Sequence, residues 1–577
     1  MSYVDAIHDK QKDEIHIVER INGQRVYNTL PAKYVFYYED IRGRYKTMWG
    51  EPCSKYETTN SSAFKKELRA FQNLGKKIHE HDINPIFRCL SENYLNVDAP
   101  ELNIGFFDIE VDFDPTRGYA PTNDPFAPIT AISLHLSQSK RLVTFLLKPE
   151  LPKDDPDYLT WDAAEAIVNE FDDTYLCNDE VELLKMFLDA IDDADVLSGW
   201  NSTGFDIPYV VNRIERVLGK EYTKNLCLWG QRPKKRKYMK FKKEHETYDL
   251  VGRVHLDYLE LFQKHSSAEL HSYKLDHVGE VIVGENKTPY EGSLDALYKR
   301  DFRTFIEYNR QDTLLLVKID AKCRYIELAN QLAHTNSVLL PTTMGSVALI
   351  EQAIVNETWA LGMQVMSRPE RDFLNSYDAG SFVHDDDDED EEEDDNNNAV
   401  GAYVADPKKG MHKMIGCVDI NSLYPSALRA LNMGPETLVG QIRSDRTDQL
   451  VAERMARAIA GSKRAKGSKT DAWHGLFATI EFDLMHEKSG DRLTVDFEAG
   501  ETATVSAADL HKYIFESDKA YAVSANGTIF RTDVKAIIPG LLERWYAERT
   551  VMKNDAFRYT MLAKGKEISD DLANKLK

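Results

Sequence analysis

The chain has 577 residues, of which 42% are hydrophobic and 29% are charged, and its formal net charge at pH 7 is -23. This length exceeds what one hydrophobic core supports, so we expect about three to five domains. The sequence contains no signal-peptide pattern and no apolar run long enough to span a bilayer, which excludes an integral membrane protein and predicts a soluble intracellular one.

The six cysteines are scattered without CxxC pairs. This spacing argues against a disulfide framework and against a zinc site. We therefore expect reduced, mostly buried thiols.

The first predicted domain covers residues 1–102, and residues 326–372 return to it. Asn22-Gly23 lies between two alternating runs and predicts a β-hairpin. A strand at 34–38 and a helix at 63–74 complete a mixed α/β unit. No catalytic constellation is visible in this stretch.

The stretch from Gly105 to Phe113 is an apolar strand interrupted by acids. Because side chains alternate faces along a strand, Asp108 and Glu110 project from one side, about 7 Å apart along the chain. Two close carboxylates repel each other unless a cation lies between them, and their hard oxygen atoms suit Mg²⁺ or Mn²⁺. A strand with one solvated face is the simpler explanation of an isolated Asp-x-Glu. The evidence for a metal site must therefore come from other parts of the chain.

Residues 103–325 form the second predicted domain. Beside the acidic strand we expect strands at 130–136 and 142–147 and a helix at 181–191. Residues 195–206 predict a short strand and a glycine-bearing turn, followed by a helix through Ile214. Asp206 stands where the turn becomes helix, a position where a carboxylate also serves as a cap. Capping and metal binding both remain open for it.

Residues 234–243 carry seven positive charges with aromatic residues between them. Such a run is often a solvated loop, but beside a carboxylate site it favours contact with a phosphate backbone. The contact residues predicted on this basis are Lys234, Lys235, Arg236 and Lys237.

A helix is expected at about 301–325. Residues four apart share one helical face, so Tyr308 and Asp312 point the same way. A phenol beside a carboxylate could orient a water molecule. A packed tyrosine next to a surface aspartate is the simpler explanation of the pair taken alone.

The last third of the chain contains a low-complexity insert. Eleven acidic residues lie in the run 385–395, and we expect 384–399 to be a disordered loop. The other elements expected are a helix at 345–361, a strand at 414–418, a basic segment at 454–469 that contacts nucleic acid or only solvent, and a helix at 541–553.

The acidic positions occur in an order that resembles a known family. Phe107-Asp-Ile-Glu110, Asn201-x-x-x-Phe205-Asp206 and Tyr308-x-x-x-Asp312 resemble the three exonuclease motifs of family B DNA polymerases. The segment from Asp419 to Ser426, Asp-Ile-Asn-Ser-Leu-Tyr-Pro-Ser, is similar to that family's first palm motif. Resemblance to the T-even phage branch extends over Gly50-Glu-Pro-Cys53, Ser272-Tyr-Lys-Leu275 and Gly401-Ala-Tyr-Val404.

The resemblance implies a ribonuclease-H-like domain that removes mismatched 3′ ends in the 3′→5′ direction. Two Mg²⁺ or Mn²⁺ ions would be held there by Asp108, Glu110, Asp206 and Asp312. Tyr308 would help to position the attacking water. Asn201 and Phe205 would shape the site around the terminal nucleotide.

The resemblance also implies part of a right-hand polymerase, with a partial palm at 373–535 and the first part of the fingers at 536–577. Asp419 and the carbonyl of Ile420 would bind a catalytic Mg²⁺. The implied nucleotide-binding residues are Leu423, Tyr424, Arg549 and Lys553, with Tyr424 excluding a 2′-hydroxyl.

Polymerisation in this family requires a second palm carboxylate cluster. After Asp419 the chain contains neither a Lys-x-x-x-Asn-Ser-x-Tyr-Gly segment nor an Asp-Thr-Asp. A truncated chain and a naturally split polymerase both explain this, and we favour the split, with this chain as the N-terminal subunit.

The hypothesis of a split polymerase implies several partners. They are primer–template and single-stranded DNA, deoxynucleoside triphosphates, a second polypeptide that shares the polymerase-site Mg²⁺, and a sliding clamp bound through that polypeptide, in the cytoplasm of an infected bacterium. The alternatives are a stand-alone 3′→5′ DNA exonuclease and a non-catalytic nucleic-acid-binding regulator.

Overall fold

The computed structural model describes residues 2–240, 243–266, 269–368, 408–420, 422–444, 492–498, 500–516, 518, 520–524 and 527–563. These residues fall into two compact units. The first contains residues 2–47, 52–356 and 364–368, and the second contains 48–51, 357–363 and the described residues from 408 onward. The four domain boundaries proposed from the sequence stay predictions.

The first unit begins with a three-stranded antiparallel sheet of β1 (Tyr3–Asp9), β2 (Glu14–Ile21) and β3 (Gln24–Pro31). Ile21 pairs with Gln24, so Asn22 and Gly23 form a two-residue turn. Both have positive φ, 52° and 77°, a conformation that Asn-Gly adopts readily. The predicted hairpin is confirmed.

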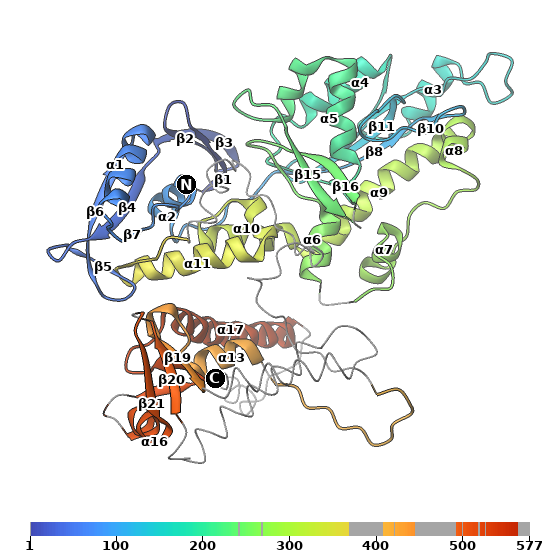
Figure 1. Cartoon of the computed structure of the whole chain (residues 1–577). Coiled ribbons are helices and arrows are strands. Elements are labelled where there is room, and N and C mark those ends of the chain that lie inside the picture. The colour runs from blue at the N-terminus through green and yellow to red at the C-terminus, as the bar shows by residue number, and fades with distance from the viewer. Residues whose placement is uncertain are drawn as a thin grey trace. The chain divides into compact units, whose positions relative to one another are not determined.

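Four neighbouring strands of a second, five-stranded sheet are, in order, β5 (Tyr45–Thr47), β6 (Pro52–Thr58), β4 (Tyr34–Glu39) and β7 (Ile78–His79). Helix α1 (Ser61–Asn73) packs on β4 and β6 (Figure 1), and α2 (Pro85–Tyr94) follows β7. Phe64 and Leu68 are the buried residues of α1, and the Asn60 side chain caps its first turn. The strand predicted at 34–38 and the helix predicted at 63–74 are confirmed.

A six-stranded mixed sheet holds the acidic strand. Its order is β13 (Thr174–Cys177), β12 (Arg141–Leu147), β11 (Ile129–Leu136), β8 (Ile104–Val111), β14 (Val196–Ser198) and β17 (Val254–His255). β11 runs antiparallel to both β8 and β12, whereas β14 is parallel to β8 and to β17. The predicted strands at 130–136 and 142–147 are β11 and β12.

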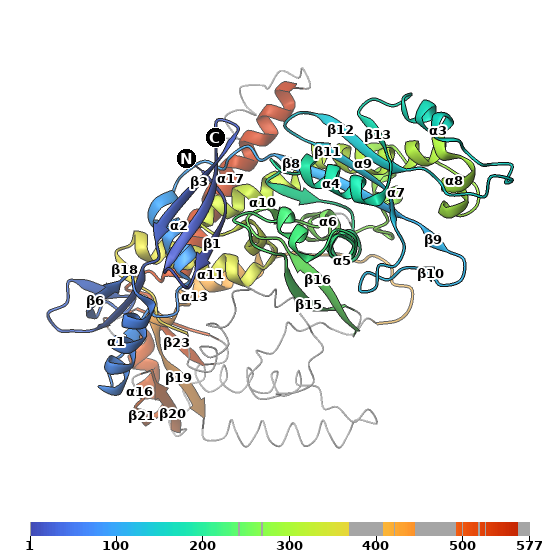
Figure 2. The same cartoon turned by 90° about the horizontal axis from the view of Figure 1, so that it is seen from above.

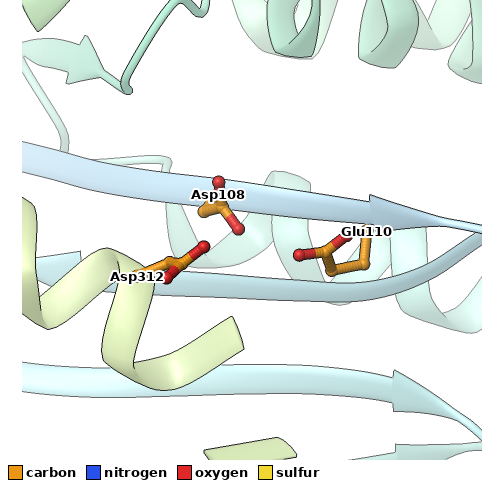
Figure 3. Close-up of side chains that lie close together, drawn as sticks. All are labelled: Asp108, Glu110 and Asp312. Atoms are coloured by element: carbon orange, nitrogen blue, oxygen red, sulfur yellow. The ribbon is translucent and has the colours of Figure 1, made fainter. Parts of the chain in front are cut away.

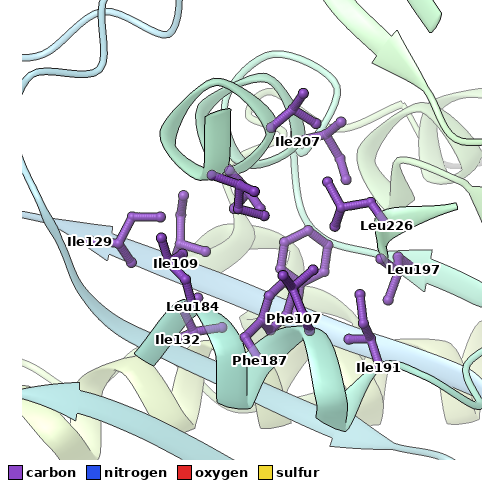
Figure 4. Packing of buried hydrophobic residues seen from close by; sticks show 14 of the residues in the cluster. Phe107, Ile109, Ile129, Ile132, Leu184, Phe187, Ile191, Leu197, Ile207 and Leu226 are labelled. Carbon is purple, nitrogen blue, oxygen red and sulfur yellow. The ribbon is translucent and has the colours of Figure 1, made fainter. Parts of the chain in front are cut away.

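Alternation along β8 sends its residues to two different environments. Phe107 and Ile109 enter an apolar cluster with α4 (Glu180–Ala190) and α5 (Asp206–Val217), in which Ile132, Phe187 and Ile207 are also buried (Figure 4). Asp108 and Glu110 therefore face away from this cluster, toward α9 (Phe302–Cys323). The apolar residues anchor the strand, and this anchoring holds its acids in place.

The other helices of the first unit surround this sheet or continue beyond it (Figure 2). They are α3 (Trp161–Val168), α6 (Tyr258–His265), α7 (Leu275–Val283), α8 (Leu294–Arg300), α10 (Tyr325–Asn336) and α11 (Ser346–Ala360), whose residues from Glu357 onward belong to the second unit. Short strands β9 (Phe113–Asp114) and β10 (Gly118–Tyr119) pair next to β8, and β18 (Met363–Gln364) follows α11. The helices predicted at 181–191, 301–325 and 345–361 correspond to α4, α9 and α11.

The second unit contains a five-stranded sheet in the order β21 (Thr502–Ser506), β20 (Arg492–Phe497), β19 (Leu438–Ser444), β23 (Thr528–Arg531) and β22 (Tyr521–Val523). Its helices are α13 (Leu423–Leu431), α16 (Ala507–His511) and α17 (Ile537–Ala563). The sheet buries a small core that includes Ile442, Val495 and Ile529. The helix predicted at 541–553 lies within α17.

The prediction of a strand at 414–418 was wrong. Among the described residues no strand pairs with this segment, and the side chains of Ile415 and Val418 are 75% and 93% exposed. A β-strand needs a neighbouring backbone to complete its hydrogen bonds, and the local sequence pattern cannot supply one.

Several predicted features lie outside the described residues: the acidic insert 384–399, the Gly401–Val404 motif and the basic segment 454–469. The cysteines are all free thiols, four of them buried. Among the described helices, none combines the length and the apolar character needed to cross a membrane.

Candidate metal centre

Three carboxylates from two elements converge beside β8. Oxygen atoms of Asp108, Glu110 and Asp312 all lie within 4.8 Å of one another (Figure 3). Asp312 is 3% exposed and Glu110 is 9% exposed. The predicted pairing of the strand acids with the acid of the 301–325 helix is therefore present in the structure.

Helix α9 brings Asp312 to the strand because its other residues pack against the sheet. Asp301 caps its first turn by accepting a hydrogen bond from the Thr304 amide at 3.1 Å. Phe305 and Ile306 are buried against β11 residues. Asp312 lies two turns further along the helix, beside Asp108.

A buried relay of polar side chains orients Asp108. Ser133, which pairs with Asp108 across β11 and β8, donates a hydrogen bond from Oγ to Asn309 Oδ1 at 2.6 Å. Asn309 Nδ2 in turn donates to Asp108 Oδ2 at 2.9 Å. Because Ser133 and Asn309 are both fully buried, the relay leaves Asp108 little rotational freedom.

Asp206 approaches β8 from helix α5. It is the first residue of α5, and its Oδ1 accepts a hydrogen bond from the Ile109 amide at 3.3 Å. The cap position belongs to Phe205, which makes no side-chain capping bond. The capping alternative is therefore not what the structure contains, since the Asp206 carboxylate turns toward the acidic strand.

The loop before α5 is held by an aspartate that the sequence reasoning missed. Asp257 accepts hydrogen bonds from the Asn201 amide at 3.0 Å and from the Thr203 amide at 2.9 Å. Asn201 has a positive φ of 61°, which asparagine tolerates better than most residues. Phe205 packs on the apolar cluster and against the Tyr209 ring.

A lysine that the sequence reasoning also missed enters the cluster. Lys287 Nζ donates to Asp312 Oδ2 at 2.5 Å and to the Tyr308 hydroxyl at 3.1 Å. Tyr308 is thus buried and close to the acids, as its helical spacing predicted, and it packs edge-on against Tyr290. No pattern around residue 287 indicated this contact, because Lys287 follows α7 and is brought in only by tertiary folding.

The electrostatics of the cluster favour protonation. Burial is the largest cause, and neighbouring carboxylates add to it, so the pKa of Asp108 lies well above its ordinary value and the pKa of Glu110 rises to about 8. Burial also raises the pKa of Asp206 to about 7 and raises the pKa of Asp312. Burial alone would lower the pKa of Lys287, but the Asp312 carboxylate reverses that effect and leaves it raised.

These residues fit a hard divalent cation. The donor set consists of carboxylate oxygens, and Asp312 Oδ1 is a buried oxygen with no hydrogen-bond donor. One lysine cannot balance four carboxylates at neutral pH. An oxygen-only acidic set suits Mg²⁺ or Mn²⁺ better than a softer transition metal.

The predicted DNA-contact residues lie on a hairpin whose charges are partly compensated. Residues 234–240 and 243–249 form β15 and β16. Lys235 pairs with Glu246 at 2.6 Å, Lys237 with Glu244 at 2.7 Å, and Arg236 with Asp249 at 3.0 Å. Binding of these cations to phosphate would cost free energy, because the cross-strand ion pairs would have to break. Lys234 lies at the base of the same hairpin.

The predicted polymerase residues are exposed. Asp419 and Ile420 lie in a segment that is neither helix nor strand, and Leu423 and Tyr424 begin α13, with Tyr424 65% exposed. Arg549 and Lys553 lie one turn apart on α17 and line a shallow depression with Trp545, Glu548 and Met552. Among the described residues, Asp419 belongs to no group of three or more acidic, histidine or cysteine side chains that could hold a metal ion.

Comparison with known proteins agrees with both sets of motifs. Residues 63–278 match the family described as DNA polymerase family B, exonuclease domain, and residues 366–571 match DNA polymerase family B. The chain belongs to DNA polymerase family B. The exonuclease match contains Asp108, Glu110 and Asp206, whereas Asp312 lies beyond its end. Asp419 and Lys553 lie inside the second match.

Family B relatives share modest identity with this chain. The DNA-directed DNA polymerase of Escherichia phage RB69 is 24% identical over 434 residues, which cover 72% of this chain and 44% of that protein. The enzyme of Enterobacteria phage T4 is 28% identical over 248 residues, or 43% of this chain and 25% of that protein. The chain therefore spans less than half the length of these relatives.

Proposed function

We propose that the carboxylate cluster is the active site of a divalent-metal-dependent 3′→5′ DNA exonuclease. The observation that carries this proposal is the convergence of Asp108, Glu110 and Asp312 within 4.8 Å in a buried setting. The family match over 63–278 supports it. The sheet supports the ribonuclease-H-like assignment, because β8, β11 and β12 form an antiparallel meander and β14 and β17 add in parallel beside β8.

In this proposal Asp108, Glu110, Asp206 and Asp312 hold the metal ions, two in number by analogy with the family. Such ions supply an activated water and stabilise charge on the leaving 3′ oxygen. Asp108 keeps its orientation through Asn309 and Ser133. The Tyr308 hydroxyl, held by Lys287, positions the attacking water.

The proposed substrate is the 3′ end of a single DNA strand. A terminal nucleotide must leave its duplex before its last phosphodiester can reach a buried site, and this costs least at a mismatched end. Asn201 and Phe205, on the loop held by Asp257, are proposed to line the path of that nucleotide.

A degradation assay tests the proposal. The purified chain is incubated with a 5′-labelled single-stranded oligonucleotide and Mg²⁺ or Mn²⁺, and with excess chelator as a control. We expect a ladder of products shortened from the 3′ end, no products with chelator, and none with the double variant Asp108→Asn/Asp206→Asn. Retained DNA binding with no metal-dependent shortening would favour the regulator alternative.

We further propose that residues 366–571 contribute one half of a polymerase site, on the strength of the second family match. Asp419 and the Ile420 carbonyl would bind a Mg²⁺, and Tyr424, with Leu423 beside it, would contact the sugar of the incoming nucleotide. Arg549 and Lys553, one turn apart, would contact its triphosphate. The remaining palm carboxylates would come from a second polypeptide, through which a sliding clamp would also bind.

A primer-extension assay separates this proposal from a stand-alone exonuclease. The chain is mixed with a labelled primer–template, Mg²⁺ and all four deoxynucleoside triphosphates, with and without a candidate second polypeptide. Extension only in the mixture is expected. Extension by this chain alone would contradict the need for a partner, and shortening under every condition would favour the stand-alone exonuclease.

A further inference from the structure

A strongly basic stretch lies in the N-terminal part of this acidic protein. Residues 41–77 contain nine lysine or arginine side chains and three glutamates, a net charge of +6 in a chain whose total is -23. Local charge rather than total charge decides whether a polyanion binds. The structure shows how these cations are displayed.

Helix α1 turns one polar stripe outward. Ser62, Lys65, Lys66, Arg69 and Asn73 recur at intervals of three and four residues, so they share one helical face. All five are exposed and line an open depression of about 500 Å³. The opposite face packs Phe64 and Phe71 against Phe36 of β4, which fixes the orientation of the helix.

Two cations of the stripe are not neutralised in the way that the cations of the predicted DNA-contact hairpin are. Lys66 and Arg69 form no ion pair within the described part of the chain, whereas Lys235, Arg236 and Lys237 each pair with an acid across β15 and β16. The single glutamate of α1, Glu67, lies off the stripe. A ligand reaching the stripe therefore does not have to displace a protein carboxylate from Lys66 or Arg69.

The chemistry of the stripe selects a phosphodiester backbone rather than an acidic protein. Its side chains are cations and small hydrogen-bonding groups, and Ala70 is the only apolar residue in the depression. A protein interface would present an apolar centre. From Ser62 to Asn73 the stripe covers about 16 Å along the helix axis, enough for several consecutive phosphates of one strand. It offers no aromatic surface for a base.

We infer that the outward face of α1 is a sequence-independent binding surface for the sugar–phosphate backbone of a single nucleic-acid strand, separate from the carboxylate cluster. Binding there depends on charge, so it weakens as salt rises. For a single strand each phosphate contact contributes a slope of about 0.7 in log affinity against log salt concentration. The surface contacts long strands and is indifferent to their bases.

Fluorescence anisotropy with labelled dT30 and U30 in chelator, where the strands stay intact, tests the inference with matched variants. Lys66→Gln/Arg69→Gln removes two charges from the stripe. Lys33→Gln/Lys318→Gln removes two charges from exposed lysines that already pair with Glu92 and Glu285. We expect the stripe variant to bind about tenfold more weakly at 0.1 M salt, with a slope reduced by about 1.4, and the control to bind within about twofold of the unmodified chain.

Equal weakening by both double variants, or weakening by neither, would overturn the inference. The conservative variant Arg69→Lys keeps the charge and must bind like the unmodified chain, because a loss equal to that of Arg69→Gln would indicate a structural effect. Equal losses for dT30 and U30 are expected, and a loss confined to one of them would refute backbone recognition.

The nuclease assay separates this inference from the proposed function. A four-nucleotide substrate has only three internucleotide phosphates and gains little from binding the stripe, so the stripe variant should degrade it at the unmodified rate. Stripe-dependent binding without any degradation would leave the inference standing and remove the exonuclease. Degradation together with binding that does not depend on the stripe would support the exonuclease and remove the inference.

Discussion

Two acidic motifs of this chain reach different structural states. Asp108 and Glu110 lie on a strand paired on both sides, and α9 closes over them with Asp312, so three carboxylates meet in a buried site. Asp419 lies in an exposed segment that pairs with no strand in the described part of the chain. A carboxylate motif becomes a metal-binding candidate only when neighbouring elements force its acids together. The following predictions test this contrast.

The largest expected effect separates the two motifs by activity. Asp108→Asn removes one charge from the cluster and should lower the rate of oligonucleotide degradation by at least about 10³-fold, because metal-assisted hydrolysis depends on the full carboxylate set. Asp419→Asn should leave that rate within about twofold. Rates are compared on one 5′-labelled strand at saturating Mg²⁺. Similar losses for both variants would place Asp419 in the nuclease chemistry and end the contrast.

Divalent metal should stabilise the protein through the buried cluster. A ligand at 100 to 1,000 times its Kd adds about 2.7 to 4.1 kcal/mol to the free energy of unfolding. Thermal unfolding with Mg²⁺ and with chelator measures this gain. Asp419→Asn should keep it, and Asp312→Asn should lose most of it.

The stabilisation that Mg²⁺ gives against unfolding should increase with pH. Burial raises the pKa of Glu110 to about 8 and that of Asp206 to about 7, from 4.5 and 3.8. A raised folded-state pKa contributes stability below about pH 4, and that stability is lost as pH rises through about 7 to 8. In chelator the unfolding temperature should therefore fall from pH 5 to pH 8, and Mg²⁺ should offset the fall. A gain independent of pH would mean that the ion binds elsewhere.

Lys287 should matter most when metal is absent. Lys287→Gln removes the ammonium that donates to Asp312 and should lower the free energy of unfolding in chelator by about 1 to 3 kcal/mol, because a buried charge loses its partner. Mg²⁺ should recover most of this loss. Lys318→Gln, which breaks a surface pair with Glu285, should change stability by less than about 0.5 kcal/mol. An equal, metal-insensitive loss for both variants would contradict this role.

The smallest expected effect concerns the relay behind Asp108. Ser133→Ala leaves Asn309 Oδ1 without its donor and should cost about 0.5 to 1.5 kcal/mol in stability. It should also lower kcat for degradation several-fold with little change in KM, because Asp108 is less well oriented while the strand still binds. Ser137→Ala, at the residue that directly follows β11 and lies away from Asp108, serves as the control. A rise in KM alone would indicate that the relay acts on substrate binding.

The sequence correctly predicted the elements that are specified by patterns within a few residues. Asn22-Gly23 specified its own turn, and the four-residue spacing within the helix expected at 301–325 placed Tyr308 and Asp312 on one face. The alternation around Asp108 and Glu110 placed both acids on one side of a strand. Each of these follows from bond geometry and from neighbours within a few residues.

Other results depended on distant partners. The 414–418 pattern predicted a strand, but pairing requires a second strand that local sequence cannot specify. Lys287 is 25 residues before Asp312 in the sequence and enters the site only because the chain after α7 passes over α9. The basic run at 234–243 looked like a free cationic surface, yet three of its side chains face acids of β16 across a hairpin.

The sequence by itself determined which acids, on which strand and helix faces, this family B chain offers to a metal, because side-chain periodicity is a property of each element alone. Only the tertiary structure decided which of them meet, which cation accompanies them, and that Lys66 and Arg69 form no ion pair with the described residues. Those outcomes depend on burial and on contacts between residues far apart in the chain, and such contacts exist only after the elements have packed.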